Sequence, residues 1–419
     1  PRPLKGRPLQ TVAAPIGPPY DRLPQLTARW GRSNDRGFDY AIEGDFTRFR
    51  ADPFWTRQPN ADRGFVQAQL AHPFTRPWGF FTPRVQLHAS HYRFDRPIPG
   101  GATSAARALP TVSLDGGLVF EREARFFGRD FTQTLEPRLK YVYTPYRDQG
   151  RLPLYDTGAY DFNFATIWAE NAFAGNDRIV DNNLVTGGLT TRLLDPESGA
   201  EVVRLGLAQR YRFSGQQVVL PGGTPTERGL SDIMLGAGIN WDPRWSFDSV
   251  VQYNPDTRRS TRTTLQGRYS PGPYRTVSAA YRHQRDLQSE HLDVGWQWPL
   301  SDLAGRRGEL GTTAARSGSG SCNGRWYSVG RLNYSLRESR LVDAILGVEY
   351  DAGCWIGRVV LEKLTSSTTS STKRIMFQLE LVGLSRLGSN PLRTLRNNIP
   401  RYQYLREETT SPSRFTEYE

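Results

Sequence analysis

The chain has 419 residues, a net charge of +12 and only 37% hydrophobic residues. No stretch approaches the roughly 20 consecutive apolar residues of a membrane-spanning helix, which excludes a helical membrane protein. Aromatic residues reach 12%, which argues against disorder. The basic residues are spread along the whole chain and no reader motif accompanies them, so we expect no nucleic-acid partner.

The first segment, residues 1–21, is rich in proline and predicts a linker or strap rather than a strand. It lacks the basic and apolar regions of a signal peptide. We therefore expect a mature segment or a fragment of an exported protein.

From residue 22 onward, polar and apolar residues alternate. In 133–143, Leu139 and Tyr141 fall on one face of a two-residue repeat, and Arg138 and Lys140 fall on the other. A period of two over nine or more residues predicts β-strands. The predicted strands are 22–30, 38–49, 64–71, 82–94, 111–121, 131–143, 161–169, 183–194, 202–213, 231–241, 245–254, 261–270, 275–284, 291–298, 326–336, 342–350, 354–364 and 373–384.

These strands have the length that a tilted strand needs to cross a bilayer, and short turns alternate with long loops. Tryptophans lie near strand ends, as expected at the rims of an apolar band. We predict an all-β fold, an antiparallel transmembrane β-barrel segment over 22–384 with a polar C-terminal tail over 385–419. A soluble β-protein is the alternative, although ten tryptophans over so many strands are less expected there.

The search for catalytic and metal-binding residues is largely negative. The five histidines have no spacing typical of a zinc site, and no nucleotide-binding P-loop is present. His283 lies near Arg285 and Asp286, but nothing fixes a nucleophile beside it. We therefore expect no enzyme, no cofactor and no metal.

Charged residues on the polar strand faces are expected to line an aqueous lumen. They could simply stiffen the wall as ion pairs, or they could contact an amphiphile with an anionic head group, for which arginine is well suited. The candidates are Asp115, Glu121, Glu136, Arg138, Lys140, Arg204, Arg210 and Arg212.

The chain has two cysteines, Cys322 and Cys354. An even count in an exported chain suggests a disulfide between them. Each could instead pair with a cysteine outside this chain, and the sequence leaves the choice open.

Several segments resemble the LptD family of lipopolysaccharide-assembly proteins. The most specific resemblance lies in the sequences of 113–123 (SLDGGLVFERE) and 133–149 (QTLEPRLKYVYTPYRDQ). Residues 176–179, 189–193 and 377–384 are similar to further family segments. The likeness runs over about residues 20–400. A porin or TonB-type transport barrel, the alternative, would share the alternation but lack the wording of 113–149.

The resemblance implies a barrel of 26 strands, of which this chain holds about eighteen, preceded by a periplasmic jellyroll. It implies insertion of lipopolysaccharide into the outer leaflet of the Gram-negative outer membrane through a lateral gate. The expected partners are lipopolysaccharide, outer-membrane lipid, an LptE-like lipoprotein plug and an LptA-like periplasmic bridge that contacts the missing N-terminal domain.

The resemblance also assigns roles to residues near the C-terminal end. The strand 373–384 would form one side of the gate, with Phe377, Leu379, Leu381 and Gly383 as gate residues. Family members can carry two adjacent cysteines late in the barrel. Trp355 follows Cys354 here, so a two-bridge arrangement is not supported.

Overall fold

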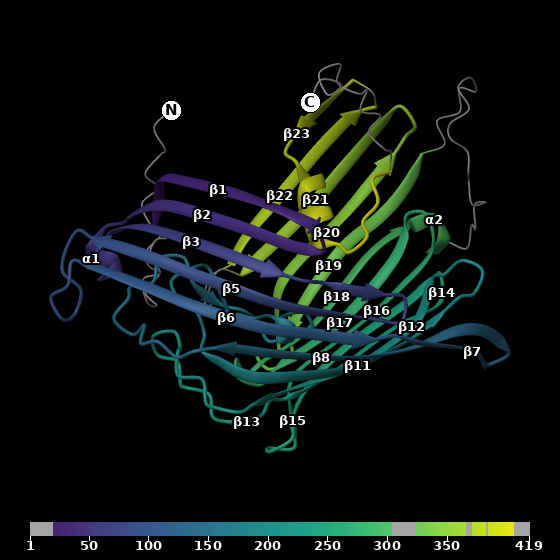
Figure 1. Ribbon diagram of the computed structural model, residues 1–419. Coiled ribbons are helices and arrows are strands. Elements are labelled where there is room, and N and C mark those ends of the chain that lie inside the picture. The colour runs from purple at the N-terminus through teal and green to yellow at the C-terminus, as the bar shows by residue number, and fades with distance from the viewer. Residues whose placement is uncertain (1–19, 304–323, 366–370, 383, 406–419) are drawn as a thin grey trace. The chain divides into compact units, whose positions relative to one another are not determined.

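The computed structural model describes residues 20–303, 324–365, 371–382 and 384–405 (Figure 1). The strands within these ranges belong to an antiparallel sheet of 21 strands, apart from one two-stranded pairing. The all-β antiparallel fold predicted from the sequence is confirmed. Within the described ranges, no helix is both long and apolar enough to span a bilayer.

The elements of the first half follow each other along the chain, with a four-residue helix and a short 3₁₀ helix in the connections. They are β1 (Asp21–Asp35), β2 (Phe38–Arg50), α1 (Pro53–Thr56), β3 (Ala61–Ala71), β4 (Phe74–Arg76), β5 (Gly79–Phe94), β6 (Ser104–Leu118), β7 (Phe120–Phe126), β8 (Arg129–Thr144), β9 (Gly158–Ala159), η1 (Thr166–Trp168), β10 (Phe173–Ala174), β11 (Asn182–Leu194), β12 (Glu201–Arg212) and β13 (Gly229–Leu230).

The second half continues the series of strands and ends in a helix. Its elements are β14 (Ile233–Asp242), β15 (Trp245–Asn254), β16 (Arg259–Gly272), β17 (Arg275–Gln284), β18 (Ser289–Pro299), α2 (Leu300–Leu303), β19 (Arg325–Ser335), β20 (Arg340–Asp351), β21 (Trp355–Thr365), β22 (Ser371–Leu381), β23 (Ser385–Gly388) and α3 (Pro391–Asn398).

The chain divides into two compact units. The first comprises residues 1–122, 134–191 and 207–234, and the second comprises 123–133, 192–206 and 235–419. In the first unit, the long strands pair antiparallel in chain order, as β1–β2, β2–β3, β3–β5, β5–β6 and β6–β8, with the short strands β4 and β7 in the connections. Such pairing needs only local turns between neighbours.

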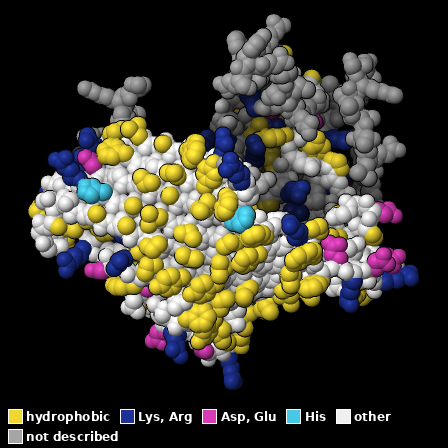
Figure 2. Space-filling model, viewed as in Figure 1, with side chains coloured by type: hydrophobic (Ala, Val, Ile, Leu, Met, Phe, Trp, Pro, Cys, Tyr) yellow, Lys and Arg dark blue, Asp and Glu magenta, His cyan; other side chains and the backbone are white. Residues whose placement is uncertain are grey.

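The sheet of the first unit has the polarity of a membrane barrel. Val85 and Leu114 are exposed, whereas Arg63, Arg107 and Ser113 are buried. A soluble antiparallel sheet would bury its apolar face, but a transmembrane barrel turns that face to lipid and its polar face inward. Figure 2 shows hydrophobic side chains gathered over the exposed face of β3, β5 and β6.

The second unit repeats this inversion. Consecutive strands from β15 to β23 pair antiparallel. Val359 and Leu361 are exposed on β21, whereas the alternate positions Arg358, Val360 and Glu362 are buried. The alternation predicted from the sequence is therefore an alternation between an outer apolar face and an inner face that carries charged residues, with an apolar patch at Val329, Ile345, Val360 and Met376.

The segment 385–405 differs from the polar tail expected over 385–419. β23 pairs with β22, and α3 buries Leu392 and Leu395 against Val360 and Met376. Apolar residues three and four apart give α3 one apolar face in an otherwise polar sequence, which an average over the tail conceals. The tail after 405, like the linker up to residue 19, lies outside the described residues.

The strand predicted over 161–169 is wrong. That segment belongs to a long connection between β8 and β11 and contains η1. The Asn163 side chain accepts hydrogen bonds from the backbone N–H groups of Ala165 (2.9 Å) and Thr166 (3.0 Å). Asparagine competes with regular pairing in this way, and the alternating Phe, Phe and Trp residues around it imitate a strand.

Candidate functional site

The connection 145–181 folds against the buried polar face of the first unit. Three side chains of the sheet reach it, namely Arg63 on β3, Tyr92 on β5 and Arg107 on β6. Their partners in the connection are Gln149, Asp156, Asn176 and Asp177. Long loops without much secondary structure are unusual in compact folds and commonly functional.

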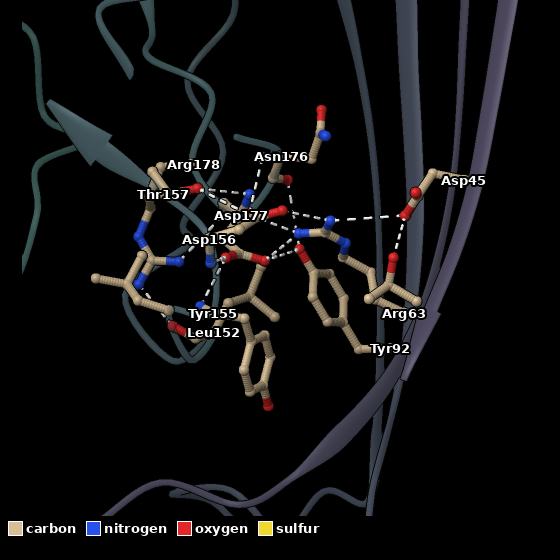
Figure 3. A network of polar contacts seen from close by, with 12 residues as sticks. Asp45, Arg63, Tyr92, Leu152, Tyr155, Asp156, Thr157, Asn176, Asp177 and Arg178 are labelled. Carbon is tan, nitrogen blue, oxygen red and sulfur yellow. Dashed lines mark hydrogen bonds and ion pairs between the residues drawn. The ribbon is translucent and has the colours of Figure 1, made fainter. Parts of the chain in front are cut away.

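An ion network around Arg63 holds this loop (Figure 3). The guanidinium lies 2.6 Å from Asp156 and 2.8 Å from Asp177. Asp45 on β2 lies 3.8 Å from the same group. The side chains of Arg63 and Asp177 are 1% and 0% exposed, so the contact is shielded from water and stronger than a surface pair.

Asp177 accepts further hydrogen bonds from both sides of the network. The Tyr92 hydroxyl donates to its Oδ1 at 3.0 Å, and the backbone N–H groups of Tyr155 and Asp156 donate to its Oδ2 at 2.7 and 2.9 Å. A buried carboxylate needs such partners because it has lost its hydration. Asp177 therefore joins two segments of the loop to each other and joins the loop to the sheet.

The two loop carboxyls have opposite pKa shifts. Burial alone would raise the pKa of Asp156, but hydrogen bonds and charge from Arg63 outweigh it and lower that pKa to about 2. For Asp177, burial and the neighbouring Asp156 charge raise the pKa above its ordinary value. One guanidinium thus pairs with two carboxyl groups, and Asp156 stays ionised to a lower pH than Asp177 does.

Two more arginines satisfy the buried backbone of the loop. Arg107 donates to the carbonyl oxygens of Asn176 and Asp177, each at 2.7 Å. Arg178 donates to the carbonyl oxygen of Leu152 at 2.6 Å. Irregular backbone can be buried only when its polar groups find partners, and here arginine side chains provide them.

A second polar cluster joins the loop to β6 and β8. Lys140 lies 3.2 Å from Glu170 of the loop and 3.7 Å from Asp115. Arg138 pairs with Asp115 at 2.6 Å and lies over the Trp168 ring at 4.3 Å. Three of the predicted lumen residues, Asp115, Arg138 and Lys140, thus meet in one cluster.

The other predicted lumen residues lie elsewhere. Arg210 is buried and donates to the carbonyl oxygen of Ile167, and Arg212 donates to Gln216 at 3.1 Å. Glu136 accepts a hydrogen bond from Thr134 at 2.8 Å. Glu121 is exposed on β7, and Arg204, in the second unit, is exposed beside Glu201 at 3.5 Å.

Sequence reasoning missed the residues at the centre of the site. Arg63 fell one residue outside the predicted strand 64–71. Asp177 was noted only as part of the resembling segment 176–179. Nothing in the neighbouring sequence distinguishes these two charged residues from solvated ones, because Arg63 and Asp177 pair with each other across 114 positions of the chain.

The inner face of the second unit carries its own buried ion network. Arg358 lies 2.9 Å from Glu349 and 2.5 Å from Glu380. The Tyr402 hydroxyl donates to Glu349 at 2.5 Å. Burial and the Glu349 charge raise the pKa of Tyr402, so its hydroxyl remains a donor. The chain after α3 is therefore fixed to the sheet by polar as well as apolar contacts.

The predicted gate strand corresponds to β22. Phe377 and Leu381 are exposed and Leu379 is half-buried, while Gly383 lies outside the described residues. Cys354 is exposed, and no described residue forms a disulfide with it. Cys322 also lies outside the described residues, so the structure does not test the disulfide.

Among the side chains that the structure describes, no group of three or more His, Cys, Asp or Glu residues could hold a metal ion. The two clusters of the first unit are mixed ion pairs, which is the arrangement of a structural or solvated wall.

Comparison with known proteins decides between the barrel classes. The model of the family LptD, LPS transport system D, matches residues 8–303. The chain belongs to the LptD family. It is 60% identical to the LPS-assembly protein LptD of Albidiferax ferrireducens over 420 residues, covering 100% of this chain and 52% of that protein. An Acidovorax relative is also 60% identical and has 51% of its length covered.

The chain also matches more distant family members over nearly its whole length. The LptD of Ralstonia nicotianae is 38% identical, with 98% of this chain and 49% of that protein covered. The chain thus spans about half the length of these relatives. Among solved structures, a ferric enterobactin receptor of Pseudomonas aeruginosa is similar at a TM-score of 0.39 and 10% identity, covering 87% of this chain and 62% of the receptor.

Proposed function

We propose that the full-length protein inserts lipopolysaccharide into the outer leaflet of the Gram-negative outer membrane, and that this chain provides the C-terminal barrel part. The observation that carries the proposal is the inverted sheet in a member of the LptD family. Exposed apolar side chains suit lipid, whereas the buried face holds arginines, lysine and carboxylates.

The inner face suits the polar part of such a substrate. Phosphorylated sugars need water and cationic partners, and arginine binds phosphate through two parallel hydrogen bonds. Arg84 and Arg138 border the second cluster with part of their side chains exposed, so we place them among the groups that a phosphate would meet. Acyl chains would leave between strands, at an edge that includes β22.

The partners follow from the same proposal. An LptE-like lipoprotein would plug the lumen, and an LptA-like bridge would deliver substrate to the periplasmic domain outside this chain. No nucleotide-binding motif occurs in the sequence, so the energy for transport would come from other components.

Controlled depletion of the full-length protein tests the proposal. We expect surface lipopolysaccharide, measured by access of an outer-leaflet modifying enzyme, to fall while periplasmic lipopolysaccharide accumulates. A plasmid copy with Arg84→Gln and Arg138→Gln should restore it only in part, and a copy with the exposed Arg29→Gln should restore it fully. Normal surface lipopolysaccharide after depletion would refute the function.

A further inference from the structure

One end of the first unit carries the long connections between strands. Residues 51–60, 95–103 and 145–181 join β2 to β3, β5 to β6 and β8 to β11 there. At the opposite end, residues 36–37 join β1 to β2, and residues 77–78 join β4 to β5. In outer-membrane barrels the longer loops are extracellular and the short turns are periplasmic. The end with the long connections therefore lies at the outer leaflet.

Three arginines gather around Asp62 on the outer face at this end, and we call these four residues the arginine row. Arg48 of β2 and Arg93 of β5 lie opposite Asp62 of β3 in the register of the sheet. Arg48 and Arg50 lie 3.0 and 3.1 Å from Asp62. Arg93 is exposed and forms no ion pair within the part of the chain that the structure describes. Three guanidinium groups against one carboxylate give the row a net positive charge, and Figure 2 shows basic side chains at this end of the strands, beside α1.

A shallow groove of about 660 Å³ lies in the outer face next to the arginine row. Gly64, Ala106 and Ala108 line it with little or no side chain, and Val66 and His91 stand beside them. A Cβ built on Gly64 would have nothing within 4 Å, so the space over this glycine is open. The groove is thus an apolar depression in a wall that faces lipid.

The row and the groove together have the layout of an amphiphile. Gly64 follows Asp62 by two residues on β3, so the groove begins about 7 Å closer to the centre of the bilayer than the row does. Arg48 and Arg93 are two strands apart, which is about 10 Å, and both can contact one phosphorylated head group. A phosphate monoester carries close to two negative charges, whereas the phosphodiester of a glycerophospholipid carries one. The excess positive charge of the row therefore favours a phosphorylated sugar.

We propose that this part of the outer wall binds one lipopolysaccharide molecule of the outer leaflet, with a sugar phosphate on the arginine row and an acyl chain in the groove. The inference goes beyond the proposed function, because it concerns lipid that is already in the membrane. The site lies on the opposite face of the sheet from the buried clusters around Arg63 and Lys140. It is therefore separate from the inner face along which the polar part of the substrate would pass.

Lipid cross-linking in the full-length protein tests the site. The protein is reconstituted in nanodiscs of phosphatidylethanolamine that contain lipopolysaccharide as a small minority of the lipid. A p-benzoylphenylalanine probe replaces Ser104, which lies opposite Arg93, and a matched probe replaces Val112, which is exposed on the same face of β6 outside the groove. We expect lipopolysaccharide to dominate the adducts at 104 and phospholipid to dominate those at 112. Adducts that follow the lipid composition at both positions would overturn the proposal.

The variant Arg48→Gln with Arg93→Gln tests the contact with the head group. The matched control is Arg76→Gln, which removes an exposed arginine from the same face of the sheet at the end with the short turns. Since hydrogen bonds to charged groups are the strong ones, we expect the enrichment of lipopolysaccharide at 104 to fall about tenfold in the double variant. The control should leave it unchanged.

The chemistry of the lipid is tested on the parent protein. Dephosphorylated lipopolysaccharide should be enriched at 104 as poorly as lipopolysaccharide is in the double variant. Phosphatidylglycerol, offered as the same minority of the lipid, should also show little enrichment. Equal enrichment of either lipid with intact lipopolysaccharide would overturn the proposal, as would an equal loss in the double variant and in Arg76→Gln.

Gly64→Leu tests the groove, because the added side chain would occupy the open space over Gly64. The matched control is Ala68→Leu, which adds a leucine on the same face of β3 outside the groove. Both variants should fold, because each presents an apolar side chain to lipid. We expect Gly64→Leu alone to reduce the enrichment at 104, and equal enrichment in the two folded variants would refute the role of the groove. Failure of the proposed function would instead appear as normal surface lipopolysaccharide after depletion, whatever the adducts at 104.

Discussion

Replacing Arg63 with glutamine should release the loop 145–181 from the sheet. The change removes a cation that lies within 2.8 Å of both Asp156 and Asp177 and leaves the two carboxyls buried. Breaking a buried ion pair on one side typically costs about 3–5 kcal/mol. Because 1.4 kcal/mol is a factor of ten, loop opening should become roughly a hundred- to several-thousand-fold more frequent.

Hydrogen exchange measured by mass spectrometry on the purified full-length protein would detect this. Peptides from 150–180 should exchange faster in Arg63→Gln than in the parent protein. The control is Arg29→Gln, which removes an ion pair of similar length, 3.0 Å to Glu43, from an arginine whose side chain is 74% exposed. Exposed pairs contribute about 0–1 kcal/mol, so the control should leave exchange nearly unchanged.

The reasoning depends on the loop being held by charge rather than by its apolar contacts. Equal exchange in Arg63→Gln and Arg29→Gln would therefore refute it. Faster exchange throughout the strands, rather than in the loop alone, would also refute it, because it would mean that Arg63 supports the sheet and not the loop.

Three further outcomes follow from the same structure. Leu361→Arg on the outer face of β21 should lower the unfolding free energy in lipid vesicles by about 2–4 kcal/mol, whereas Leu287→Arg, at an exposed turn position, should change it little; equal effects would contradict a lipid-facing β21. Lys140→Met and Glu170→Gln should be coupled by about 0.5–3 kcal/mol in a double-mutant cycle read by loop proteolysis, and additivity would mean that their 3.2 Å contact does not hold the loop. The folded-state pKa of Asp156, about 2, lies below its ordinary 3.8, so its contribution to docking should be complete above 3.8 and lost as the pH falls through 2. Arg63→Gln should weaken this pH dependence of loop exchange, because Arg63 makes the largest contribution that lowers the pKa of Asp156.

The strands could be predicted from the sequence because their signal is local. The two-residue period of a strand can be recognised within nine or so of its own residues, without knowledge of the rest of the chain. It found the hairpins of the sheet, but it also produced a false strand at 161–169, where Asn163 bonds to the backbone two and three residues ahead. The apolar face of α3 was likewise hidden in a polar average.

The site could not be predicted in the same way. Arg138, Lys140 and Asp115 were identified because they stand on polar strand faces, and β6 and β8 pair in a register that brings Asp115 opposite Lys140. The partners of Arg63 come from a loop, whose path depends on contacts between residues 93 and 114 positions apart. No local pattern encodes such contacts, and only the family wording pointed to Asp177.

The separation between Arg63 and its partners also has a consequence for the order of folding. Neighbouring strands can zip together through turns of a few residues, whereas contacts distant in sequence form late because loop closure must come first. Arg63 on β3 can meet Asp156 and Asp177 only after the intervening 93 and 114 positions of chain have been brought together. Before the loop docks, Arg63 has no carboxylate from the loop to pair with. Docking of the loop is therefore a late step in the folding of this part of the sheet.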